Sequence, residues 1–131
     1  MLTLDRLDHI VLTVRDMPRT LDFYTKVLGM QAVTFGAGRR ALAFGRQKIN
    51  LHHADAPYSP HAHLPAPGTA DLCFITTRPL DAAMQHVRDA GVTIELGPVE
   101  RTGATGPLRS FYVRDPDDNL IEIANALDAG A

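Results

Sequence analysis

The sequence predicts an α+β protein built from two βαβββ modules, which form a curved mixed sheet with a helix on the outer face of each half. The same order of strand-like and helix-like periodicity occurs twice, and a proline-rich segment without periodicity separates the two copies. We expect one domain over residues 1–131, with a first module at about 4–53, a linker at 54–69 and a second module at about 70–126.

The first module begins with a strand over residues 7–14, where apolar and polar residues alternate and β-branched residues are frequent. Asp16-Met17-Pro18 then signals the start of a helix, and apolar residues recur at helical spacing until Gly29 ends it. Three short strands follow, at 31–35, 40–44 and 48–53.

The second module repeats this order after a linker that contains four prolines. Residues 71–77 read as a strand, Pro79 opens a helix with apolar residues at i, i+3, i+4 and i+7, and Gly91 ends it. The remaining strands are predicted at 93–96, 109–113 and 120–125.

Composition and charge narrow the function classes. The net charge is −2, so the chain carries no electrostatic footprint for nucleic acid or for an anionic membrane, and we expect a small-molecule partner. Cys73 is the only cysteine, and no run of eighteen apolar residues occurs. We therefore expect a soluble, cytoplasmic protein.

Alternation within the strands gives each module one apolar face and one polar face. Polar groups buried on the second face without partners would cost about 1 to 3 kcal/mol each, so they must surround water, a ligand or a metal. The residues of this face are His9, Thr13, Asn50, His52, Asp71, Cys73, Ser110, Tyr112 and Glu122.

Imidazole and carboxylate groups that converge from separate strands are what a catalytic divalent metal needs. His9 and Glu122 are the first candidates, and Asp71 is the third because the repeat aligns it with His9. The fourth position is open between Asn50, which occupies it by register, and His52. Zn, Ni, Mn, Fe and Co all suit such a mixed set.

The chain resembles the vicinal oxygen chelate superfamily, which includes glyoxalase I, extradiol dioxygenases, fosfomycin-resistance proteins and bleomycin-binding proteins. It is most similar in kind to the small single-chain glyoxalase-domain-containing proteins. The segments that carry the resemblance are LDHIVLTVRDMPRTLDFYTKVLGM at 7–30, QKINLH at 47–52, ADLCFIT at 70–76 and RSFYVRDPDDNLIEIAN at 109–125.

The resemblance implies a metal held by the first, fourth, fifth and eighth strands, with His9 and Glu122 at the motif positions. Glyoxalase I usually has a glutamate at the position of Asn50 and a histidine or glutamine at that of Asp71. Extradiol enzymes usually have a tyrosine ten residues before the glutamate, as Tyr112 is here. His52 and Tyr112 are the candidate acid–base residues, and Arg109 or Arg114 is a candidate for binding an anionic group.

These observations favour a divalent-metal-dependent, glyoxalase-like enzyme that acts on a small oxygen-rich substrate by lyase or isomerase chemistry. Two alternatives stay open, namely an extradiol-type dioxygenase and a metal-free module that sequesters a small molecule. Because two βαβββ halves would leave an apolar patch exposed, we expect a homodimer whose sites are shared between subunits.

Overall fold

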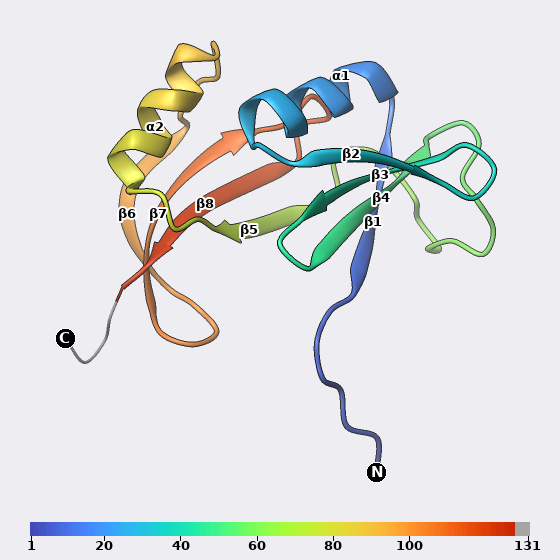
Figure 1. Ribbon diagram of the computed structural model, residues 1–131, viewed down its shortest axis with the longest axis horizontal. Helices are drawn as coiled ribbons and strands as arrows, with labels where there is room; N and C mark the ends of the chain where they lie inside the picture. The colour runs from blue at the N-terminus through green and yellow to red at the C-terminus, as the bar shows by residue number, and fades with distance from the viewer. Residues whose placement is uncertain (128–131) are drawn as a thin grey trace. The chain divides into compact units, whose positions relative to one another are not determined.

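The computed structural model describes residues 1–127, and contacts divide the chain into two compact units, Met1–Pro67 and a second that begins at Gly68. Each unit has its own four-stranded mixed sheet and its own helical element (Figure 1). The predicted α+β class with two βαβββ modules is therefore confirmed.

The first unit has the strand order β1-β4-β3-β2. The parallel β1–β4 pair places the first and last strands of the module side by side, and β2 and β3 continue the sheet in antiparallel fashion. The elements are β1 (His9–Val14), α1 (Met17–Asp22), the π-helical turn η1 (Phe23–Val27), β2 (Gln31–Phe35), β3 (Arg39–Phe44) and β4 (Gln47–His53).

The predicted single helix of the first unit widens into a π-helical turn in its second half. Asp16 caps its start by accepting a hydrogen bond from the Arg19 N–H at 3.0 Å, as expected from the sequence. The turn buries the adjacent residues Phe23 and Tyr24 together, and the Thr25 hydroxyl bonds back to the Leu21 carbonyl at 2.7 Å.

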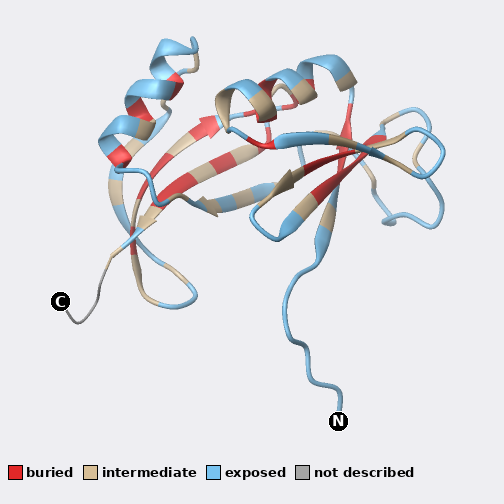
Figure 2. Ribbon diagram, viewed as in Figure 1, coloured by how far each residue is buried: buried red, intermediate tan, exposed pale blue. Residues whose placement is uncertain are grey.

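The core of the first unit lies between the helix and the predicted apolar face of the sheet. Figure 2 shows this burial along the strands, whereas the segment before His9 is exposed. Full burial of a side chain such as Val, Leu, Ile, Phe or Met stabilises the fold by about 1.5 to 3 kcal/mol. The buried apolar residues are Leu12, Val14, Phe23, Tyr24, Met30, Ala41, Leu42, Ile49 and Leu51.

The second unit repeats the topology with the strand order β5-β8-β7-β6. Pro79 provides no side-chain cap for α2, and Asn125 of β8 replaces it by accepting a hydrogen bond from the Leu80 N–H at 2.8 Å. The elements are β5 (Asp71–Ile75), α2 (Leu80–Asp89), β6 (Leu96–Thr102), β7 (Pro107–Arg114) and β8 (Leu120–Ala126).

The prediction for the sixth strand was wrong in position. A strand was expected at 93–96, but β6 begins at Leu96 and continues to Thr102 despite Pro98. The chain tolerates this proline because β6 is an edge strand and because its register shifts between Leu96 and Val99. Gly97 lies at the shift with φ 131°, and a Cβ there would approach the Phe111 Cβ to 2.6 Å.

The core of the second unit forms between α2 and the apolar face of β7 and β8. The outward side of α2 is exposed in Figure 2, as its polar residues require. The buried apolar residues are Leu80, Met84, Val87, Leu108, Phe111, Val113, Ile121, Ile123 and Ala124. Within residues 1–127, no helix is both long and apolar enough to cross a membrane.

Candidate functional site

The polar face of the first unit carries His9, Asn50 and His52 on the neighbouring strands β1 and β4. Register places His9 opposite Lys48 and places His52 opposite Thr13. His9 and His52 are thus four positions apart along the sheet, or about 13 Å. Asn50, which is opposite Val11, is therefore nearer to His9 than His52 is.

His9 is held by its neighbour in sequence. Its Nδ1 lies 2.9 Å from the Asp8 carboxylate, and this contact lowers the pKa of Asp8. When the ring donates through Nδ1, the tautomer leaves Nε2 with a free lone pair. A carboxylate behind a histidine is the usual outer partner of a metal-binding imidazole.

Asn50 and His52 are both buried, with 5% and 6% of their surface exposed. Among the described residues 1–127, the Asn50 Oδ1 and both ring nitrogens of His52 have no hydrogen-bond partner. Burial and the nearby charges of Arg39 and His61 lower the pKa of His52, so its ring is neutral at pH 7. Unpartnered buried atoms of this kind cost about 1 to 3 kcal/mol each.

A cavity of about 120 Å³ lies beside His52 within the first unit. Tyr58, from the proline-rich linker, has its ring centre 6.4 Å from that of His52. The Arg39 guanidinium lies 4.1 Å from the centre of the Tyr58 ring. Arg40 also borders the cavity, but it is opposite Leu51, so its side chain lies on the helix-facing side of the sheet. Sequence reasoning missed Arg39, Arg40 and Tyr58.

The polar face of the second unit gathers Asp71, Cys73, Tyr112 and Glu122. Glu122 is opposite Cys73 on β5 and opposite Tyr112 on β7, so three side chains form one row across the sheet. Burial, the Glu122 charge, a hydrogen bond to that carboxylate and the Asp71 charge together raise the pKa of Cys73 to about 11. The Glu122 Oε2 is buried and finds no hydrogen-bond partner in the part of the chain that the structure describes.

Tyr112 receives a hydrogen bond from a residue that the sequence analysis did not single out. The Arg101 Nε donates to the Tyr112 phenol oxygen at 2.9 Å. The misplaced sixth strand hid this residue, because Arg101 falls on the polar face only when β6 is extended to Thr102. The Tyr112 O–H remains available to donate to a ligand.

The two arginines expected to receive an anionic group are engaged elsewhere. Arg109 pairs with Asp81 of α2 at 3.4 Å, on the helix side of the sheet. Arg114 makes a bidentate ion pair with Glu95, at 3.0 and 3.1 Å, and this pair lowers the pKa of Glu95. The structure therefore does not support the anion-binding expectation for either residue.

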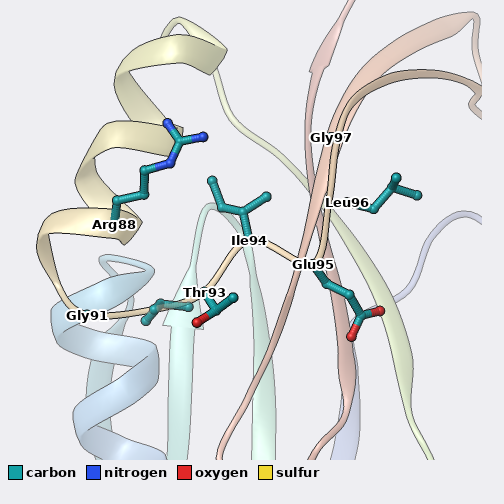
Figure 3. Close-up of a pocket in the computed structure, with 8 residues that line it drawn as sticks. Arg88, Gly91, Thr93, Ile94, Glu95, Leu96 and Gly97 are labelled. Atoms are coloured by element: carbon teal, nitrogen blue, oxygen red, sulfur yellow. The ribbon is translucent and has the colours of Figure 1, made fainter.

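A wide hollow of about 690 Å³ lies between the end of α2 and the start of β6 (Figure 3). Its walls are largely the turn after α2, with the Arg88 side chain rising from the helix and Glu95 on the strand side. It contains none of the predicted site residues, and its carboxylate is already paired with Arg114. The predicted site residues on the polar faces of the sheets lie elsewhere.

The predicted metal ligands are distributed over both units. His9 belongs to the first unit, whereas Asp71 and Glu122 share one face of the second. Among residues 1–127, the structure shows no group of three His, Cys, Asp or Glu side chains arranged to hold a metal ion. The ligand set His9, Asp71 and Glu122 stays a prediction.

Comparison with known proteins places this architecture in a family. Residues 6–123 match the family described as the Glyoxalase/Bleomycin resistance protein/Dioxygenase superfamily. Virulence protein STM3117 of Salmonella typhimurium is 55% identical over 121 residues, which are 92% of this chain and 84% of that protein. The crystal structure of an integron cassette protein from the mobile metagenome of V. cholerae is 58% identical, with a TM-score of 0.94 over 95% of this chain and 98% of that one.

One more distant relative is named as an enzyme. The lactoylglutathione lyase of Escherichia coli O157:H7 is 33% identical over 133 aligned positions, which cover 95% of this chain and 96% of that enzyme. The family match, these identities and the duplicated βαβββ topology agree with the resemblance stated above. The chain belongs to the Glyoxalase/Bleomycin resistance protein/Dioxygenase superfamily.

Proposed function

We propose that this protein is a divalent-metal-dependent, glyoxalase-like enzyme that acts on a small oxygen-rich substrate by lyase or isomerase chemistry. The observation that carries the proposal is the Glu122 carboxylate, whose Oε2 is buried without a partner on the polar face of the second unit. A buried carboxylate oxygen is stable there only when a cation, a donor group or water meets it. The relation to a lactoylglutathione lyase supports this reaction class.

The residues present fit a divalent cation. Glu122 and Asp71 supply hard oxygen donors from one sheet face, and His9 supplies a nitrogen whose orientation Asp8 fixes. When bound by these three residues, a cation would polarise two adjacent oxygens of the substrate. Zn, Ni, Mn, Fe and Co are all compatible with this ligand set.

Tyr112 is the acid–base residue that the geometry supports best. It shares a register row with Glu122, and the hydrogen bond from Arg101 fixes its phenol oxygen. Its O–H can donate a proton to a substrate oxygen and recover it afterwards. His52, the other predicted acid–base residue, borders the separate cavity in the first unit, and a different role for it is inferred below.

We propose further that the protein works as a homodimer in which both subunits contribute to each site. Both β1 and β5 are edge strands of their sheets. Each exposes an aliphatic side chain on the polar face, with Val11 45% and Ile75 56% exposed. Exposed edge strands with apolar side chains are surfaces that proteins normally cover.

Metal binding tests the proposed function directly. Protein made without a histidine tag is stripped with a chelator and equilibrated separately with Mn, Fe(II), Co, Ni and Zn. We expect about one bound equivalent per chain for at least one metal, and about a tenth or less for Glu122→Gln. Glu100→Gln, whose residue is opposite Arg109 on the other face of β6, is the matched control and should bind like the wild type.

The substrate class follows from activity with the loaded protein. If the metal-loaded protein isomerises a hemithioacetal of a 1,2-dicarbonyl compound, lyase or isomerase chemistry is supported. If the Fe(II)-loaded protein instead cleaves a catechol with consumption of oxygen, the extradiol dioxygenase alternative applies. If every metal binds at less than about a tenth of an equivalent per chain, the proposed metal-dependent function is wrong. The metal-free module that sequesters a small molecule is then the remaining alternative. The melting temperature of the metal-free Glu122→Gln variant should stay close to that of the wild type. The substitution changes a carboxylate whose Oε2 makes no hydrogen bond within residues 1–127, so little stabilising interaction is lost.

A further inference from the structure

The cavity beside His52 has the chemistry of an anion site. It is lined by Arg39, Arg40, His52 and His53 among its polar residues, and no Asp or Glu lines it. Residues 1–67 contain eight Lys and Arg against five Asp and no Glu, so the whole unit carries net positive charge. The cavity therefore lies in a positive field with no carboxylate in its walls.

The ring of His52 has no hydrogen-bond partner within residues 1–127. Both of its nitrogens are buried, and the residue is only 6% exposed. The Arg40 Nε is also buried, but Arg40 is opposite Leu51 and so lies on the other face of the sheet. Arg39 contacts the rings of Tyr58 and Phe35, with its guanidinium 4.1 and 4.7 Å from their centres, and makes no ion pair within the described part of the chain. Stacking of this kind fixes the guanidinium plane while its N–H groups stay available.

The linker builds one wall of the cavity. After β4, the Ala56 N–H donates to the His53 carbonyl at 3.2 Å, and this turn brings Tyr58 near His52. Tyr58 is 57% exposed, so this wall of the cavity borders solvent.

The size of the cavity limits the ligand. A volume of about 120 Å³ equals that of about four water molecules at the density of the liquid. This is enough for a phosphate, a sulfate or a small carboxylate group. Arginine and a histidine N–H are the donors that bind such groups most strongly.

We infer that the cavity beside Arg39, His52 and Tyr58 is a binding site for a small oxyanion, either a phosphate or a carboxylate, free or as part of a larger ligand. Arg39 supplies N–H donors and compensating charge, and His52 donates one ring N–H to an anion oxygen. Tyr58 keeps the Arg39 guanidinium in place. The inference does not depend on the proposed metal, because His52 is about 13 Å along the sheet from His9.

Ligand titrations of the metal-free full chain test the inference. Inorganic phosphate and acetate are titrated separately in a chelator-containing buffer at constant ionic strength, and binding is followed by calorimetry and by the NMR signals of the histidine rings. We expect saturable binding of at least one anion with one site per chain, and a shift of the His52 ring signals while those of His86 on α2 stay in place. Binding of phosphate alone or acetate alone identifies which oxyanion the cavity takes.

Two variants and one control distinguish a specific binding site from nonspecific attraction by positive charge. Arg39→Gln and His52→Phe should each weaken the binding at least tenfold. Arg46→Gln removes the same charge from the turn between β3 and β4, outside the cavity, and should bind within about twofold of the wild type.

Three results would overturn the inference: no saturable binding of either anion, unmoved His52 signals, or an equal loss of affinity in Arg46→Gln. The NMR measurement uses the wild-type chain, so the test stands even if a cavity variant fails to fold. Failure of the metal experiment leaves this result unaffected, because the titration contains no metal and no turnover.

Discussion

The reactivity of Cys73 gives a direct measure of the carboxylate beside it. Desolvation of the thiol by neighbouring atoms is the largest cause that raises its pKa to about 11, although the residue as a whole is exposed, and the charge and hydrogen bond of Glu122 follow. Glu122→Gln removes the charge and keeps the size of the side chain. The pKa of Cys73 should therefore fall, and the thiolate, which is the reactive form, should become more abundant at pH 8.

The expected magnitude has an upper bound. A complete return of the pKa from about 11 to the ordinary 9.0 would raise the thiolate fraction at pH 8 about ninetyfold. The thiolate would at the same time become about eightfold less nucleophilic, so the net gain in rate cannot exceed about tenfold. Because burial persists in the variant, we expect a gain of about two- to fivefold.

The assay is alkylation of the native protein by iodoacetamide at pH 8, followed by mass spectrometry; Cys73 is the only cysteine, so the label reports one site. Glu100→Gln serves again as the control and should react at the wild-type rate. An unchanged or slower rate for Glu122→Gln would show that the carboxylate does not face the thiol. It would also remove the geometric basis for Glu122 as a ligand beside Asp71.

Three further predictions concern single contacts of the second unit. Asn125→Ala removes the group that caps α2 and bonds two loop carbonyls, so the free energy of unfolding in urea should fall by about 2 to 3 kcal/mol. Gly97→Ala places a Cβ against Phe111 at a φ that L-residues rarely adopt, and should lower the melting temperature through a loss of about 2 kcal/mol or more. Arg114→Gln should return the pKa of Glu95 toward 4.5 in an NMR titration. The ion pair stabilises the wild type at a pH above the ordinary carboxyl pKa of 4.5, and this stability is lost as the pH falls through the lowered pKa of Glu95. The free energies of unfolding of the wild type and the variant should therefore converge at low pH.

Prediction from sequence succeeded where the signal is local. Alternation within strands placed Glu122, Tyr112 and Asp71 on one face of a sheet, and the register of β5, β7 and β8 agrees with that assignment. It failed at β6, where Pro98 argues against a strand in any local reading. An edge position and a shifted register make the proline acceptable, and both are properties of the assembled sheet.

The sequence by itself determined the duplicated βαβββ order, the family resemblance and the candidate residues, because all three depend on periodicity and motifs along the chain. Only the tertiary structure showed the Tyr58 ring near His52, the Arg39 guanidinium over that ring and the hydrogen bond from Arg101 to Tyr112. The linker that contains Tyr58 has no periodicity from which its path could be predicted. Its position depends on contacts with β3 and β4, which form when the chain folds and have no counterpart in the residue pattern.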